Sequence, residues 1–246
     1  MPEQPEQQLP PVQRLRVRYA KRGRLRFTSH RDFSRAFERA VFRARIPMAY
    51  SSGFNPHPRI SYAGAAPTGS SSEAEYLEIA LAQVVDPAAV HAALDEALPD
   101  GLDVLEVVES RGGGLADRLE ASAWRLTLPG VSPDAAADAV ARFLAAEEVS
   151  VQRMTKKGMR TFDCREAVVS LVSQGGEVSG SECAILEVVL RHGTPSVRPD
   201  DILAGLREVA GLDAGVAPLQ ERQAQGPLDP QTGTVGDPLE PDRDAG

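Results

Sequence analysis

Several short segments of the chain alternate between hydrophobic and polar residues, and each alternation predicts a β-strand with one buried face. In residues 13–20, Leu15 and Val17 lie on one face of the predicted strand, and Arg16 and Arg18 lie on the other. We therefore expect the first strand to carry a cationic outer face. Further strands are predicted in this half of the chain at residues 59–65, 75–82 and 102–108.

A helical period replaces the alternation after Ser29. Apolar residues then recur with the spacing of one helical stripe, at Phe33, Ala36, Phe37, Ala40, Val41 and Ala44. Ser29 is a favoured N-cap residue, Asp32 places a carboxylate in the first turn, and Pro47 ends the helix. Arginines recur every four residues on the opposite side of the helix, at Arg31, Arg35, Arg39 and Arg43. This row predicts a cationic helix surface.

The order of the elements predicts an α+β fold. With a second helix at residues 87–98, the first half reads strand–helix–strand–strand–helix–strand, which is the split βαβ, or ferredoxin-like, unit. The second half repeats this order with strands at 121–128, 149–155 and 182–191, helices at 133–146 and 200–210, and a possible closing strand at 214–220. Residues 156–174 add a strand-like stretch and a short helix around 166–172. We therefore expect two tandem ferredoxin-like units, with an insertion in the second.

The composition sets the expected boundaries of these units. Residues 1–12 are polar and proline-rich and predict a disordered leader, and residues 222–246 predict a disordered acidic tail. Between them we expect a basic N-terminal unit at 13–110, a linker at 111–120 and the second unit at 121–221.

Charge is distributed unevenly along the chain. The formal net charge is −8, yet residues 1–60 contain thirteen basic and four acidic residues, a local charge of +9 that leaves −17 for the remainder. Such polarity indicates a partner that carries phosphate or acidic groups. The alternative is a solvated basic surface that is balanced by acidic parts of the same fold.

Other features exclude whole classes of protein. No stretch of 18 apolar residues is present to span a membrane, and the N-terminus does not read as a secretory signal. Cys164 and Cys183 are too few for a disulfide framework, a zinc site or an iron–sulfur cluster. We expect a cytoplasmic protein that makes no contact with membranes, binds no metal and has no cofactor of its own.

The loop at residues 51–59, SSGFNPHPR, carries the densest set of binding groups. Gly53 permits a positive φ, Phe54 can stack on a nucleic-acid base, and Asn55, His57 and Arg59 offer hydrogen bonds and charge. The alternative is a rigid turn that buries Phe54. The candidate binding residues are Ser29, His30, Arg31, Arg35, Arg39, Gly53, Phe54, Asn55, His57, Arg59, Lys156 and Lys157.

Four segments resemble the radical SAM-linked protein family, whose members are fused to, or encoded beside, cobalamin-binding radical SAM proteins. They are FTSHRD at 27–32, IPMAYSSGFNPHPRIS at 46–61, PTGSSSEAEYL at 67–77 and TKKGMRTFDCR at 155–165. Cys164 departs from the pattern, which has a hydrophobic residue there. The resemblance spans about residues 13–220 and implies a radical SAM partner, which would itself carry the iron–sulfur cluster, S-adenosylmethionine and cobalamin. More distantly, the expected fold and the GFNPHP loop are similar to ferredoxin-like endoribonucleases that process CRISPR repeat RNA.

These observations favour an accessory module that binds RNA, or a similar anion, and presents it to the partner enzyme. We expect no catalytic activity from the chain alone. One alternative is a metal-independent endoribonuclease that uses His30 or His57 as general acid or base, with Arg31 or Lys157 stabilising the phosphate. Another is a protein-binding scaffold whose basic surface docks an acidic partner.

Overall fold

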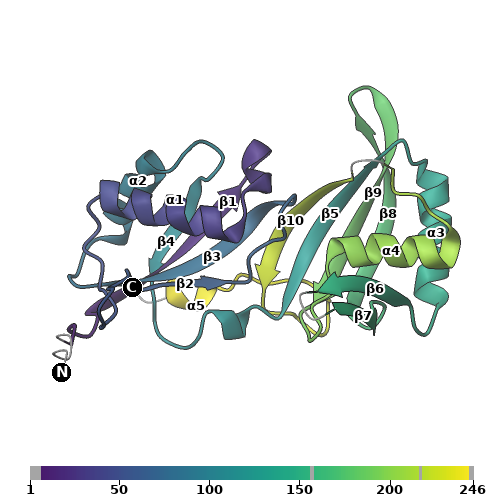
Figure 1. The fold of residues 1–246 in the computed structure, drawn as a ribbon. Helices are drawn as coiled ribbons and strands as arrows, with labels where there is room; N and C mark the ends of the chain where they lie inside the picture. Colours follow the sequence, from purple (N-terminus) through teal and green to yellow (C-terminus); the bar gives the residue numbers. More distant parts are fainter. Residues whose placement is uncertain (1–6, 156–157, 216–217, 244–246) are drawn as a thin grey trace. The chain divides into compact units, whose positions relative to one another are not determined.

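A computed structural model describes residues 7–155, 158–215 and 218–243 (Figure 1). The chain forms two compact units. Unit 1 contains the residues up to Arg118 and those from Pro238 onward, and unit 2 spans Leu119–Asp237. The chain first passes from unit 1 to unit 2 after Arg118, which lies within residues 111–120, the expected linker. None of the helices in these described ranges is long and apolar enough to cross a membrane.

Unit 1 has the topology of the split βαβ unit. Its elements follow the chain as β1 (Gln13–Lys21), α1 (His30–Arg43), β2 (Ile60–Ala63), β3 (Ser71–Leu81), α2 (Pro87–Ala97) and β4 (Val104–Glu109). The strands lie in the order β4-β1-β3-β2, and each pair of neighbours is antiparallel. Short 3₁₀ turns at Gly23–Phe27 and Ala116–Arg118 and the helix α5 (Glu240–Arg243) complete the unit. The predicted α+β class is confirmed.

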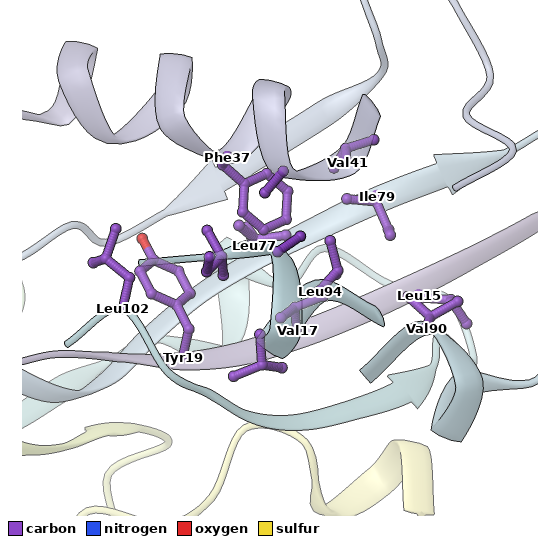
Figure 2. Packing of buried hydrophobic residues seen from close by; sticks show 14 of the residues in the cluster. Leu15, Val17, Tyr19, Phe37, Val41, Leu77, Ile79, Val90, Leu94 and Leu102 are labelled. Atoms are coloured by element: carbon purple, nitrogen blue, oxygen red, sulfur yellow. The ribbon is translucent and has the colours of Figure 1, made fainter. Parts of the chain in front are cut away.

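The core of unit 1 forms because α1 and α2 cover the same face of the sheet (Figure 1). The apolar stripe of α1 supplies Phe37 and Val41, and α2 supplies Leu94; they pack against strand residues such as Val17 and Leu77 (Figure 2). Each of these side chains is at most 3% exposed. Burying one such side chain fully contributes about 1.5–3 kcal/mol, so this stripe anchors α1 and fixes which of its faces meets solvent.

Unit 2 repeats this topology with an added hairpin. It contains β5 (Ala121–Pro129), α3 (Pro133–Ala145), β8 (Val168–Val178), β9 (Ser181–Arg191), α4 (Pro199–Ala210) and β10 (Leu219–Gly226). The strand order is β10-β5-β9-β8, with antiparallel neighbours. The added hairpin consists of β6 (Ser150–Thr155) and β7 (Gly158–Asp163) and forms a separate two-stranded sheet. The insertion that we expected at residues 156–174 is therefore misplaced: residues 150–155, expected as a strand of the main sheet, belong to the hairpin, and β8 takes their place beside β9.

The prediction of a helix around residues 166–172 is wrong, because most of this segment belongs to β8. It pairs with β9, and the register shifts between Val168 and Ser170. The shift breaks the strict alternation that would have identified a strand from the sequence. The valines of the segment favour an extended backbone once a neighbouring strand is available to pair with.

The expectation of a disordered tail is wrong for residues 222–243, whereas residues 1–6 and 244–246 of the expected disordered termini lie outside the described residues. Residues 222–226 belong to β10, and α5 places Leu239 and Asp242 in buried positions of unit 1. At the other end, Val12 donates its backbone N–H to the carbonyl of Leu81, and Gln8 donates its own to Ser52. A few specific contacts order these segments although their average composition is polar and rich in proline and glycine.

Candidate nucleic-acid interface

Two candidate residues lie at the N-terminus of α1. Ser29 caps the helix: its hydroxyl accepts a hydrogen bond from the backbone N–H of Asp32 at 3.2 Å and donates one to the Asp32 carboxylate at 2.7 Å. The His30 ring lies edge-on to the Tyr62 ring, with 4.9 Å between the ring centroids. Tyr62 is half-buried, and burial raises the pKa of its hydroxyl. Ser29 therefore has a structural role that accounts for its position.

The arginine row of α1 faces solvent. All four arginines are exposed, and Arg43 donates a hydrogen bond to the carbonyl of Ala97 at 3.1 Å. Within the part of the chain that the structure describes, Arg31, Arg35 and Arg39 form no hydrogen bond or ion pair. Three guanidinium groups on one helix are therefore available to an external anion.

An exposed aromatic residue, Phe42, lies in this row, and sequence reasoning missed it. Phe42 is 83% exposed, because it follows Val41 by one position and so falls outside the buried stripe. With Arg35, Glu38, Arg39 and Arg43 it lines an open hollow of about 600 Å³. The sequence contains the signal that would have found it. Phe42 lies outside the apolar stripe and follows Arg39 by three residues and Arg35 by seven, so it lies on the polar face of the helix.

A second hollow adjoins the first one. Its volume is about 400 Å³, and its lining residues are Glu38, Val41, Phe42, Arg45, Ile46, Tyr50 and Pro58. Phe42 and Glu38 thus border both hollows. We call the exposed surface formed by Arg31, Arg35, Glu38, Arg39, Phe42 and Arg43 the arginine face.

The loop between α1 and β2 holds the remaining candidates of unit 1. Gly53 has the positive φ that we expected, at 134°. The Phe54 side chain is 72% exposed, which rules out the alternative in which the loop buries it. Asn55 and His57 are exposed as well. Arg59 donates from Nε to the carbonyl of Tyr50 at 3.0 Å, so this arginine helps to hold the loop.

The expected cationic outer face of the first strand is wrong. Arg16 of β1 is fully buried and donates to Asp242 at 2.7 Å and to Glu78 at 3.1 Å. Its remaining nitrogen donates to the carbonyls of Gly112 and Gly113. The other face of β1 is covered by the 110–118 segment and α5, which the chain brings back from far along the sequence. The arginine at the centre of this face is consequently neutralised inside unit 1.

Other basic residues near β1 are also engaged. Arg14 pairs with Glu78 at 3.0 Å, Arg18 donates to the carbonyl of Glu73, and Arg22 pairs with both Glu73 and Asp103. Much of the positive charge of residues 1–60 is thus used internally, whereas Arg31, Arg35 and Arg39 of the arginine face are among the arginines that have no partner in the described residues.

The two remaining candidate residues follow Thr155 in the sequence. Lys156 and Lys157 lie outside the described residues. On the adjoining strands, Arg153 pairs with Asp201, and Arg160 is exposed.

Several titratable groups with shifted pKa values lie in the interior of unit 2. Burial raises the pKa of the Cys164 thiol to about 12 and raises that of the Asp201 carboxyl. Burial also lowers the pKa of His192, whose ring nitrogens contact the carbonyl of Leu119 at 2.8 Å and the hydroxyl of Ser122 at 3.2 Å. Over the described ranges, no three histidine, cysteine or acidic side chains are grouped so as to hold a metal ion.

Comparison with known proteins identifies the family. The family model described as "uncharacterized protein conserved in bacteria (DUF2344)" matches residues 14–199, about three quarters of the chain. This range includes α1, the loop that follows it and the β6–β7 hairpin. The chain matches no curated protein with significance. The protein therefore belongs to the DUF2344 family of uncharacterised proteins conserved in bacteria.

Proposed function

We propose that this protein is an accessory module that binds RNA through the arginine face and presents it to a partner enzyme. The observation that carries the proposal is the state of Arg31, Arg35 and Arg39, which are exposed and make no hydrogen bond or ion pair with any described residue. Guanidinium groups bind phosphate oxygens through paired hydrogen bonds, and a spaced row of them suits a phosphate backbone.

The exposed aromatic residues favour a nucleic acid over a simple anion. Phe42 lies within the row, and Phe54 and Tyr50 lie on the loop that follows α1. Phenyl and phenol rings stack on unpaired bases, so a surface that combines them with arginines suits single-stranded nucleic acid.

The resemblance to radical SAM-linked proteins supports a radical SAM enzyme as the partner. In that arrangement the partner supplies the iron–sulfur cluster, S-adenosylmethionine and cobalamin, and the present chain supplies the RNA surface. Affinity isolation of the tagged full-length chain from cells, with and without nuclease, tests this part of the proposal. We expect a radical SAM protein and RNA to co-purify, and recovery of neither would contradict it.

RNA binding itself is tested by a salt series. Purified protein is titrated into labelled transfer RNA and into a labelled single strand at several salt concentrations, beside an Arg31→Ala/Arg35→Ala/Arg39→Ala variant. If the three arginines each neutralise one phosphate of a single strand, log K falls by about 2 for each decade of salt. The variant should lose most of this slope together with its affinity at low salt.

A matched control removes the same charge elsewhere. Arg24 of unit 1 and Arg191 and Arg207 of unit 2 are exposed, and their side chains make no hydrogen bond or ion pair among the described residues. Their triple alanine variant should bind RNA with the slope of the wild type. Equal effects of the two triple variants would show that only net charge matters, and would refute an RNA-binding arginine face. Weak binding that neither variant changes would favour the protein-docking scaffold.

A further inference from the structure

Two features of the arginine face are not explained by binding to phosphates. Phe42 carries no charge, and its ring is 83% exposed beside three arginines. Glu38 is negative and repels phosphate, yet it borders both hollows of this face. A surface that bound only a phosphate backbone would be expected to carry neither residue at its centre.

The Phe42 ring is available for stacking. Among the described residues it makes no stacked or edge-on contact with another aromatic ring and no cation–π contact with an arginine. Two other exposed or half-exposed rings differ, because Phe27 lies under Arg26 and Phe162 lies under Arg153. A free phenyl face between phosphate-binding groups accepts a base that is not already stacked within a duplex.

Glu38 has the chemistry to read the edge of that base. Its exposed carboxylate makes no ion pair or hydrogen bond within the described part of the chain. An ionised carboxylate only accepts hydrogen bonds, so it favours a base edge that donates. Cytosine presents an amino group at the position where uracil presents a carbonyl oxygen, and carboxylates accept hydrogen bonds from that amino group.

We infer that Phe42 and Glu38 form a subsite for one unpaired nucleotide, in which the base stacks on Phe42 and an exocyclic amino group donates to Glu38. The arginines on either side hold the flanking phosphates. The subsite accepts cytosine and disfavours uracil. This inference rests on the proposed RNA-binding function and adds to it the strandedness and the base preference of the ligand.

The test measures the affinity of the full-length protein for labelled homopolymers of cytidine and of uridine, both of which are too short to form structure. The wild type should prefer the cytidine strand by at least about fivefold, the lower end of what one specific base contact provides. Phe42→Ala should weaken the binding of both strands by about tenfold, within the range for loss of one base stack, without changing the salt slope. Phe42→Tyr keeps an aromatic ring and should bind like the wild type.

Glu38→Gln isolates the edge contact. A side-chain amide both donates and accepts, so this variant should bind the two homopolymers with nearly equal affinity. The matched control is Glu96→Gln on α2, another exposed glutamate without a partner in the described ranges, which should keep the preference. All these residues are exposed, and thermal melts verify that each variant is folded.

The outcomes separate the inference from the function on which it rests. If the arginine variant loses the salt slope while the Phe42 and Glu38 variants bind both strands like the wild type, RNA binding stands and the subsite is refuted. A wild type without base preference, or a preference that survives Glu38→Gln, also overturns the subsite. If the wild type binds no RNA at low salt, both proposals fail.

Discussion

The ion pair between Arg16 and Asp242 offers the sharpest test of how unit 1 is held together. Both side chains are fully buried, and they are separated by 226 positions in sequence. Asp242 also accepts hydrogen bonds from Arg118 at 2.6 Å and from the backbone N–H of Arg111 at 2.9 Å. We expect Asp242→Asn to destabilise the protein strongly.

The magnitude follows from what the substitution leaves behind. The asparagine oxygen can still accept from the Arg111 amide, but the neutral side chain no longer balances two guanidinium groups. Removal of one partner from a buried ion pair costs about 3–5 kcal/mol. Glu78 remains 3.1 Å from Arg16 and offsets part of the loss, so we expect a value near the lower limit, about 3 kcal/mol.

Urea unfolding measures the free energy, and hydrogen exchange read by mass spectrometry locates the loss. We expect a lower unfolding midpoint and reduced protection in β1 and β4. The control is Asp138→Asn, which removes an ion pair with Arg142 in which both side chains are more than half exposed. This control should change stability by less than about 0.5 kcal/mol.

The dependence of stability on pH tests the ion pair between Arg16 and Asp242 in a second way. Burial alone would raise the pKa of Asp242, but the hydrogen bonds from Arg111, Arg118 and Arg16 outweigh it and hold the pKa below its usual value. A depressed pKa means that the stabilisation is complete above the unfolded-state pKa, near 3.8, and is lost as the pH falls through the folded-state value. The wild type and Asp242→Asn should therefore converge in stability in acid.

The reasoning would be refuted if Asp242→Asn unfolded within 0.5 kcal/mol of the wild type at neutral pH, as the exposed control should. A pairwise effect can also be separated from a merely local one. Adding Arg16→Met to Asp242→Asn removes the uncompensated buried charge, so the double variant should be less destabilised than the sum of the two single variants.

Three further predictions concern single sites. Gly205→Ala should cost about 1–3 kcal/mol in urea unfolding, because an added Cβ would lie 2.8 Å from the Phe143 ring, whereas Gly193→Ala meets nothing within 4 Å and should be nearly neutral. Cys164, with a pKa of about 12, should resist alkylation at neutral pH in the folded protein and react once it is unfolded; labelling in the native state would contradict its buried, protonated state. Ser29→Ala should cost about 1 kcal/mol through loss of the helix cap, while RNA affinity stays unchanged; a selective loss of affinity would show that Ser29 contacts the ligand.

The elements that could be predicted are those whose signal is local. The helix after Ser29 has an N-cap, a stripe of period 3.6 and a terminating proline, and the structure places its start at His30 as expected. Period-2 alternation likewise located β1, β3 and β5, because in each case one face is buried against helices. These signals need only neighbours within the same element.

The errors arise where a distant segment decides the outcome. Alternation placed Arg16 on the face opposite Leu15 and Val17, which is correct, but nothing nearby indicates that residues beyond 237 cover that face. The β8 segment shows the same limit, because its extended backbone depends on pairing with β9 across a register shift. Phe42 was missed for another reason. The helical period was used to find the apolar stripe that becomes buried, and Phe42 is an apolar residue that lies outside this stripe.

The charge asymmetry of the sequence resolves into two different roles. Acidic or carbonyl groups of unit 1 bind the side chains of Arg14, Arg16, Arg18, Lys21 and Arg22, whereas three arginines of α1 have no such partner among the described residues. The local charge of +9 therefore overstates the surface that a ligand meets. Nine phosphate contacts to a single strand would give a slope of about 6 in log K against log salt, and three would give about 2. A measured slope near 2 would mean that the free arginines of one helix, and not the net charge of the N-terminal region, determine how this protein holds its ligand.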